Sequence, residues 1–163
     1  MRVYLGLGSN LGDREKYLRA GLAGLAGRGI RLVRSASLYF TEPRDVPDQP
    51  WFLNTVIEAD TPLEPEQLLA ACLQVEQDNF RARGPGKGAR TLDIDIIFHG
   101  AEIIRKPGLV IPHPRLAERR FVLVPLAEIA ADVVDPGTGK TVRELLELCE
   151  DTAEVLNFSR KFR

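Results

Sequence analysis

Two aspartates, Asp93 and Asp95, lie two positions apart in the run Leu92-Asp93-Ile94-Asp95-Ile96. In a β-strand alternate side chains leave the same face, so both carboxylates would project from one face and the apolar residues from the other. Their Cα atoms would then lie about 6.5 to 7 Å apart. Mg²⁺ favours one or two carboxylates completed by water and phosphate oxygens. The spacing alone fits both a magnesium site and a solvated strand face.

Basic residues close in sequence favour the metal and phosphate interpretation. Arg90 lies just before the aspartates, and Arg81 and Arg83 lie in residues 81–89, where three glycines and one proline predict a mobile loop. Guanidinium groups bind phosphate oxygens through paired hydrogen bonds, and phosphoryl transfer depends mainly on positioning and charge neutralisation. The sequence therefore predicts a site for ATP phosphates, with the aspartates as metal ligands and Arg81 and Arg90 as catalytic cations.

A second basic segment, residues 105–120, contains His113 between two prolines and, further on, Arg119. On a rigid loop, His113 could donate a hydrogen bond to a phosphate, although a histidine of this kind also fits a core or capping role. The other histidine, His99, lies at a predicted strand end and is expected at the surface. We therefore add His113 and Arg119 to the predicted triphosphate site.

Two further classes of protein remain possible from these residues. A nucleotidyltransferase would combine a Gly-Ser element with the Asp-x-Asp pair, but those elements usually lie close in sequence, and here Gly8-Ser9 is far from Asp93. A non-catalytic nucleotide sensor would bind ATP without consuming it. The product separates the classes, because AMP indicates pyrophosphoryl transfer and inorganic pyrophosphate indicates nucleotidyl transfer.

Two glycine-rich segments resemble nucleotide-binding motifs but do not match them fully. In Gly6-Leu7-Gly8-Ser9-Asn10-Leu11-Gly12 the third glycine is one position late for a dinucleotide-binding motif. Gly139-Lys140-Thr141 ends like a phosphate-binding P-loop, but Val134 occupies the position of its first glycine. We interpret residues 8–13 as a turn after the first strand, and residues 135–139 as a tight turn before the last helix.

The bulk composition narrows the class of protein. The chain has 163 residues, 44% hydrophobic and 28% charged, with a net charge of −1. These values fit one globular domain, residues 1–163, and argue against a general nucleic-acid binder. The sequence has no signal-peptide pattern and no apolar run of membrane-spanning length. We expect a soluble, cytoplasmic monomer that binds neither nucleic acid nor membranes, with Cys72 and Cys149 as reduced, buried side chains.

Hydrophobic periodicity predicts an α+β fold. Strands are expected over residues 2–7, 30–39, 52–59 and 90–98, with 102–104 pairing to the last of these as a hairpin. Helices are expected after Asp13, from Pro65 to about Phe80, and after Thr141; Thr61-x-x-Glu64 and Thr141-x-x-Glu144 resemble capping boxes. The order predicts a ferredoxin-like βαββαβ antiparallel sheet with helices on its faces, plus a C-terminal helical extension.

Five motifs together resemble one family, the 6-hydroxymethyl-7,8-dihydropterin pyrophosphokinases of folate biosynthesis. They are Leu7-Gly8-Ser9-Asn10-Leu11-Gly12-Asp13-Arg14, Tyr39-Phe40-Thr41-Glu42-Pro43, Asp48-Gln49-Pro50-Trp51-Phe52-Leu53-Asn54, Arg90-Thr91-Leu92-Asp93-Ile94-Asp95, and Ile111-Pro112-His113-Pro114-Arg115-Leu116 continuing through Arg119 and Phe121. The resemblance extends to about Asp135, and the Arg90 to Asp95 motif is its most specific part. It implies transfer of pyrophosphate from ATP to the pterin hydroxymethyl group, with release of AMP.

The resemblance also implies roles for single residues. Asp93 and Asp95 would hold two Mg²⁺ ions, and the ATP-binding side chains would be Arg81, Arg83, Arg90, His113 and Arg119, with Glu76 supporting the site. Thr41 and Pro43 would border the pterin, Asn54 would hydrogen-bond its ring, and Phe52 and Phe121 would stack on its two faces. Without the resemblance, the two phenylalanines fit plain core packing. Residues 44–45 and 86–89 depart from the family pattern, in loops expected to close over the substrates.

Overall fold

The computed structural model describes residues 1–43, 48, 50–79 and 91–161. The elements in chain order are β1 (Arg2–Ser9), α1 (Arg14–Ala26), β2 (Arg31–Ser35), β3 (Ser37–Thr41), β4 (Phe52–Asp60), α2 (Pro65–Asp78), β5 (Asp93–His99), β6 (Ile104–Lys106), β7 (Leu109–Ile111), the 3₁₀ turn η1 (Leu116–Glu118), α3 (Arg120–Ala130), α4 (Val142–Leu148) and β8 (Val155–Lys161). This arrangement confirms the α+β class.

The main sheet has the strand order β5-β1-β4-β3-β8, and β2 also pairs with β4. β1 lies between β4 and β5 and is antiparallel to both, and β3 is antiparallel to β4. The chain passes from β1 through α1 to β2 and β3, then β4, then through α2 to β5. This is the predicted βαββαβ order, with an added strand at one edge.

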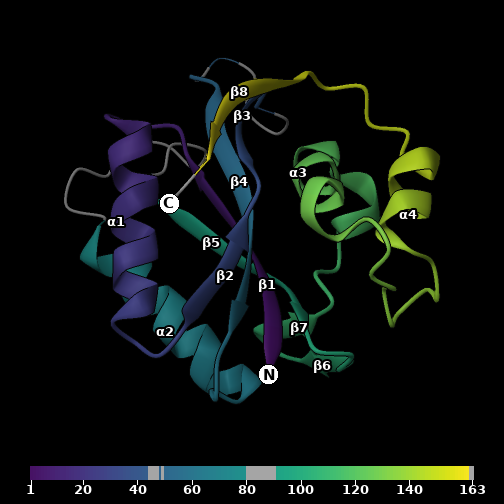
Figure 1. Ribbon diagram of the computed structural model, residues 1–163, viewed down its shortest axis with the longest axis horizontal. Coiled ribbons are helices and arrows are strands. Elements are labelled where there is room, and N and C mark those ends of the chain that lie inside the picture. The colour runs from purple at the N-terminus through teal and green to yellow at the C-terminus, as the bar shows by residue number, and fades with distance from the viewer. Residues whose placement is uncertain (44–47, 49, 80–90, 162–163) are drawn as a thin grey trace.

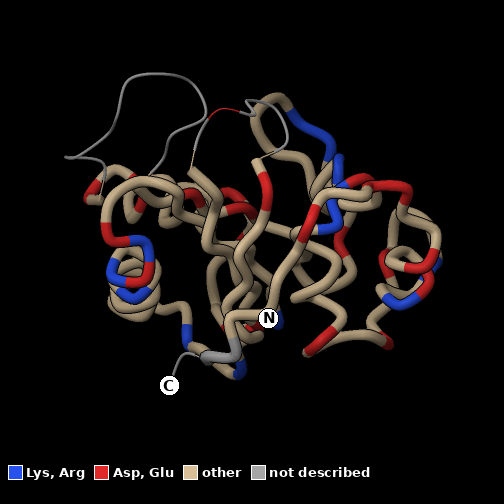
Figure 2. The backbone as a smooth tube through the Cα atoms, turned by 90° about the horizontal axis from the view of Figure 1, so that it is seen from above, with Lys and Arg blue, Asp and Glu red and all other residues tan. Residues whose placement is uncertain are grey.

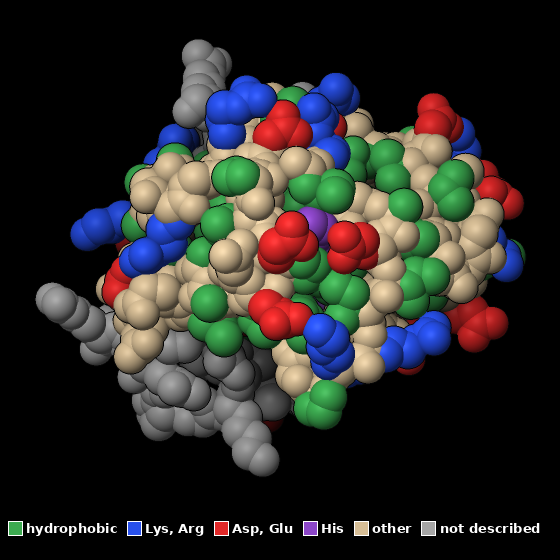
Figure 3. Space-filling view, turned by 90° about the horizontal axis from the view of Figure 1, so that it is seen from below, with side chains coloured by type: hydrophobic (Ala, Val, Ile, Leu, Met, Phe, Trp, Pro, Cys, Tyr) green, Lys and Arg blue, Asp and Glu red, His purple; other side chains and the backbone are tan. Residues whose placement is uncertain are grey.

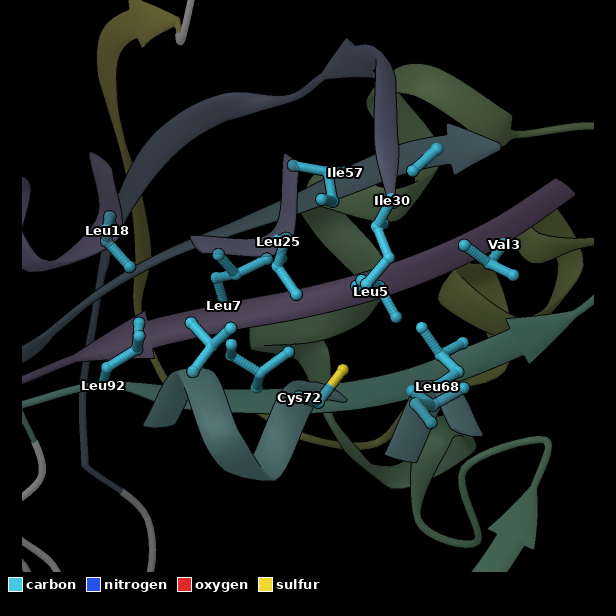
Figure 4. Packing of buried hydrophobic residues seen from close by; sticks show 14 of the residues in the cluster. Val3, Leu5, Leu7, Leu18, Leu25, Ile30, Ile57, Leu68, Cys72 and Leu92 are labelled. Atoms are coloured by element: carbon cyan, nitrogen blue, oxygen red, sulfur yellow. The ribbon is translucent and has the colours of Figure 1, made fainter. Parts of the chain in front are cut away.

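Helices cover both faces of the sheet. Figure 1 shows α1 and α2 on one side and α3 and α4 on the other. The α1–α2 side contains the larger core, in which Leu5 and Leu7 of β1 are buried against the two helices (Figure 4). The α3 side contains a second core, where Val56 and Ile97 of the sheet pack with Leu123 of α3.

The ends of two helices follow the predicted capping chemistry. Asp13 accepts a hydrogen bond from the backbone amide of Lys16 and begins α1, and Thr141 and Glu144 form the predicted box at α4. The expected box at Thr61 is wrong. Glu64 is the N-cap of α2, and the box is completed by the side chain of Gln67.

The segment predicted as one strand over residues 30–39 is two strands, β2 and β3, separated by Ala36. Both pair with β4, and the register with β4 shifts between Leu32 and Arg34. The carbonyl of Ala36 accepts from the Thr55 hydroxyl, and its amide donates to the carbonyl of Val56. A bulge of this kind bends a strand without removing it from the sheet, so periodicity alone did not reveal the break.

The hairpin expected after β5 forms elsewhere. β6 pairs with β7 in a separate two-stranded sheet rather than with β5. The connection contains Pro107 and Gly108, and Gly108 has a φ of +81°. Proline followed by a glycine with positive φ is typical of a type II turn.

The C-terminal part of the chain also differs from the prediction. The helical extension, α3 and α4, is confirmed, but the chain then adds β8, which pairs antiparallel with β3. Phe158 of β8 packs edge-on against Phe40 of β3, with ring centres 4.8 Å apart. His99, expected at the surface, is instead 2% exposed, and its Nε2 lies 2.9 Å from the carbonyl oxygen of Leu63.

Charged residues are distributed without a dominant sign. Seen from above, acidic and basic positions lie on helices, strands and loops (Figure 2). The face seen from below carries acidic and basic side chains among hydrophobic ones (Figure 3). Within the described ranges, none of the helices has both the length and the apolar character needed to cross a bilayer.

Candidate active site

A row of residues crosses the sheet on the α3 side. Asp93 of β5 pairs with Gly8 of β1, Gly8 pairs with Asn54 of β4, and Asn54 pairs with Tyr39 of β3. Directly paired residues in antiparallel strands point to the same face. The predicted metal-binding strand and the predicted pterin-binding strand therefore present their polar side chains on one face, with only Gly8 between them.

The two aspartates are arranged as their spacing predicted. Asp93 and Asp95 are half-buried, whereas Ile94 and Ile96 are buried in the α1–α2 core. Burial of the isoleucines fixes the orientation of the strand, because a shift by one residue would exchange its two faces. The sequence prediction of a shared carboxylate face is confirmed.

Glu76 of α2 reaches the outer edge of β5 between the two aspartates. Its Oε2 accepts a hydrogen bond of 2.7 Å from the amide of Ile94, and the residue is 8% exposed. Burial raises the pKa of the Glu76 carboxyl well above its usual range. The negative charges of Asp93 and Asp95 raise it further, and the hydrogen bond from Ile94 opposes both effects. Three carboxyl groups thus crowd one short stretch of strand, which favours binding of a cation.

His113 lies on the loop after β7, with its Nε2 4.0 Å from Oδ2 of Asp95. The Nδ1 atom accepts a hydrogen bond from the amide of Arg115 at 3.2 Å, so in the neutral ring the proton resides on Nε2. Burial, together with the positive charges of Arg119 and Arg115, lowers the pKa of His113 to about 4, and the negative charge of Asp93 opposes this shift. At neutral pH the ring is an uncharged donor directed toward the carboxylate side of the site.

Arg119 and Phe121 lie together where α3 begins. The guanidinium carbon of Arg119 is 5.5 Å from the centre of the Phe121 ring, a cation–π distance. Asp151 accepts a hydrogen bond of 3.1 Å from the backbone amide of Arg120 and satisfies an otherwise free amide in the first turn of α3. The C-terminal segment thereby helps to hold the turn that carries Phe121.

The acceptor residues lie together on β3 and β4. Thr41 pairs with Phe52 across the two strands, and the Nδ2 of Asn54 donates a hydrogen bond of 2.5 Å to the Thr41 hydroxyl. Thr41 and Asn54 are buried, whereas Phe52 and Phe121 are half-buried. Pro43 follows β3 and is also half-buried. An amide of fixed orientation beside aromatic rings can bind a flat heteroaromatic molecule.

Two residues of the first motif have roles that the sequence did not reveal. Asn10 Nδ2 donates to the carbonyl of Pro50 at 3.3 Å, and an Arg14 nitrogen donates to the carbonyl of Trp51 at 2.7 Å. These bonds tie the β1–α1 connection to the segment that leads into Phe52. No local pattern announces them, because both join segments distant in sequence.

Gly8 is a further residue that sequence reasoning did not place in the site. It was interpreted as part of a turn, but β1 continues to Ser9. The useful signal was the alternation itself, in which Gly6 and Gly8 share the face opposite Leu5 and Leu7. Three predicted site residues, Arg81, Arg83 and Arg90, lie outside the described residues, as do residues 44–45 and 86–89.

The donor set fits magnesium. Asp93 and Asp95 supply carboxylate oxygens on one face, beside the neutral donor His113. Among the described residues, no group of three or more His, Cys, Asp or Glu side chains is arranged to enclose a metal ion. Mg²⁺ often takes few protein ligands and completes its shell with phosphate oxygens and water.

Comparisons with known proteins identify the family to which this sequence belongs. The sequence model of the 7,8-dihydro-6-hydroxymethylpterin-pyrophosphokinase (HPPK) family matches residues 4–131. The 2-amino-4-hydroxy-6-hydroxymethyldihydropteridine pyrophosphokinase of Methylorubrum extorquens is 45% identical over 146 residues, which cover 89% of this chain and 91% of that protein. The folic acid synthesis protein fol1 of Pneumocystis carinii is 41% identical over 149 residues, 91% of this chain but 20% of that protein.

The fold is also found in a solved structure. The crystal structure of wild-type Plasmodium falciparum HPPK-DHPS superposes with a TM-score of 0.71 over 90% of this chain and 44% of that chain, at 13% sequence identity. The fold and the carboxylate-bearing sheet face thus define a class of α+β proteins with an antiparallel sheet between helices. Within that class, the chain belongs to the HPPK family of pyrophosphokinases.

Proposed function

We propose that this chain transfers the pyrophosphoryl group of ATP to the hydroxymethyl group of 6-hydroxymethyl-7,8-dihydropterin, with release of AMP, in folate biosynthesis. Membership of the HPPK family supports the reaction. The observation that carries the proposal is the row Asp93–Gly8–Asn54 across β5, β1 and β4. It brings an anionic pair suited to a metal–phosphate complex next to an amide suited to the acceptor ring.

Asp93 and Asp95 are the proposed ligands of two Mg²⁺ ions. Bound ions of this kind neutralise phosphate charge and lower the pKa of a coordinated hydroxyl. Glu76 supports the carboxylate strand by accepting the hydrogen bond of the Ile94 amide. Glu76 thereby supports the ATP site through the strand that carries the two aspartates.

The remaining donor-side residues bind the triphosphate. His113 donates from Nε2, and Arg119 contributes a guanidinium group that stacks on Phe121. Arg81, Arg83 and Arg90, outside the described residues, are proposed as further phosphate ligands. Preorganised cations and donors of this kind stabilise the charge that develops on the leaving group.

On the acceptor side, Asn54 is the proposed hydrogen-bonding residue for the pterin ring. Thr41 orients its amide, and Pro43 borders the same region. Phe52 and Phe121 are proposed to stack on the two faces of the ring. Aromatic stacking and a fixed amide hold the hydroxymethyl group in one orientation, which lowers the entropic cost of the reaction.

In the proposed step, the hydroxymethyl oxygen forms a bond to the β-phosphorus of ATP. The bond from that phosphorus to the oxygen bridging to the α-phosphate breaks, and AMP leaves with the electron pair. The β- and γ-phosphates therefore move together onto the acceptor, and the proton of the hydroxyl is released to solvent water.

We also propose that residues 1–163 form one domain and act as a monomer in the cytoplasm. The pairing of β8 with β3 supports one domain, because it joins the last described strand to the same sheet as β1. Two free cysteines, Cys72 and Cys149, are compatible with a reducing compartment. Size-exclusion chromatography with light scattering tests the monomer.

The test of function is product analysis. The protein is incubated with Mg²⁺, ATP and 6-hydroxymethyl-7,8-dihydropterin, and the nucleotide and phosphate products are separated. We expect AMP and a pyrophosphorylated pterin in equal amounts. Inorganic pyrophosphate would indicate nucleotidyl transfer, and binding of ATP without any product would indicate a sensor; either result would overturn the proposal.

A further inference from the structure

Gly8 occupies the middle of the row that joins the two halves of the site. It pairs with Asp93 on one side and with Asn54 on the other. A Cβ atom at Gly8 would lie 2.2 Å from Oδ1 of Asn54, 3.4 Å from Cγ of Asn54 and 3.6 Å from a ring carbon of Phe52. The first distance is far inside van der Waals contact. The Asn54 carboxamide thus occupies the space that a side chain at position 8 would need.

The Asn54 side chain has little freedom to give way. Its Nδ2 donates 2.5 Å to the hydroxyl of Thr41, and both residues are buried, at 7% and 1% exposure. This bond fixes Nδ2 toward β3 and leaves Oδ1 directed back over β1. A larger residue at position 8 would push Oδ1 away and break or distort the bond to Thr41.

Gly6 on the same strand offers a direct contrast. It lies two residues earlier on the same face and pairs with Asp95. Among the residues that the structure describes, a Cβ atom there would meet Cδ1 of Ile97 alone, at 3.7 Å, which is ordinary van der Waals contact. Two glycines on one strand face therefore differ in what they permit, since only Gly8 makes room for a polar side chain of the site.

We propose that Gly8 is a specificity-determining position. Its missing side chain lets the Asn54 carboxamide extend over β1, where Oδ1 can accept a hydrogen bond from a ring N–H of a flat heteroaromatic acceptor. The inference rests on the proposed function. It adds that the acceptor ring is selected by the position of the Asn54 carboxamide that Gly8 permits, as well as by the other side chains that contact the ring.

The experiment compares Gly8→Ala with Gly6→Ala. Binding of 6-hydroxymethyl-7,8-dihydropterin is measured by calorimetry in the presence of Mg²⁺ and a non-hydrolysable ATP analogue. Loss of an oriented hydrogen bond predicts that Gly8→Ala weakens pterin binding about 10- to 100-fold. Binding of the ATP analogue should stay within about threefold in both variants, and Gly6→Ala should bind pterin within about twofold of the unmodified protein. Normal pterin binding by Gly8→Ala would overturn the inference.

A double-mutant cycle with Asn54→Ala tests the mechanism. If the alanine at position 8 acts by displacing Asn54, adding Gly8→Ala to Asn54→Ala should weaken pterin binding by no more than about twofold further. An equal loss in both backgrounds would show that Gly8 acts independently of Asn54 and would contradict the inference. Should Gly8→Ala alone fail to fold, a folded double variant would support the clash, and an unfolded one would overturn it.

The outcome for the unmodified protein separates the two proposals. If it forms AMP while Gly8→Ala binds pterin normally, only the inference about Gly8 fails. If it neither binds pterin nor forms AMP, the proposed function fails as well.

Discussion

The two faces of the sheet are built for different purposes. On the α1–α2 side, β1 and β5 contribute buried aliphatic residues such as Leu5, Leu7 and Ile94. On the α3 side the same strands contribute Gly6, Gly8, Asp93 and Asp95. Period-two alternation makes this division possible, because each strand places its two residue sets on opposite faces. The packed α1–α2 face holds the strands in place. The α3 face can therefore retain two carboxylates that repel each other and two glycines that lack side chains.

Leu5→Ala is expected to have the largest effect on stability. Leu5 is fully buried in the α1–α2 core, and replacement of such a leucine by alanine costs about 2 to 5 kcal/mol of unfolding free energy. Chemical denaturation measures the change, and Leu148→Ala, at a position 62% exposed, should cost less than about 0.5 kcal/mol. The turnover of the folded fraction should change little. Equal costs for the two variants would contradict a stabilising role for this face.

Glu128→Gln should have a smaller effect, on the α3 side. The Glu128 carboxylate accepts hydrogen bonds from the Ser37 amide and hydroxyl at 3.1 Å and from the Tyr39 hydroxyl at 2.6 Å, which links α3 to β3. Weakening these charge-assisted bonds should cost about 1 to 2 kcal/mol. Glu147→Gln, at an exposed position of α4, is the control. A cost no greater than that of the control would show that the link is not stabilising.

At neutral pH the titration of His113 should have the smallest effect on stability, because the ring is then uncharged in both the folded and the unfolded state. Its pKa in the folded protein is lowered to about 4, mainly by burial, against about 6.5 in the unfolded chain. Between these values the unfolded state binds more protons, so this contribution to stability is complete above about pH 6.5 and is lost as the pH falls toward 4. His113→Gln should flatten the dependence of the denaturation midpoint on pH in this window. An unchanged pH profile would contradict the predicted shift.

The features that could be predicted from sequence are mostly local. Alternation predicted the shared face of Asp93 and Asp95, and cap chemistry predicted the starts of α1 and α4 at Asp13 and Thr141. Glu64 replaced Thr61 as the cap of α2 because Gln67 completes its box. Local patterns suffice where a residue's partner lies within a few positions.

The features that escaped prediction depend on distant partners. β8 is defined by its pairing with β3, more than a hundred residues earlier, and its sequence alternates too weakly to announce a strand. The role of Gly8 is visible only when Asn54 is placed beside it. Equally, the bonds of Asn10 and Arg14 to Pro50 and Trp51 require the assembled sheet edge.

The central claim is that the carboxylates of β5 serve chemistry while the rest of the same face binds the acceptor. Asp95→Ala tests it most directly, through AMP formation and pterin binding measured on one preparation. We predict that turnover falls by at least about 10³-fold, since charge stabilisation in the transition state is lost. The melting temperature and pterin affinity should stay close to those of the unmodified protein. Near-normal turnover by Asp95→Ala would contradict the account.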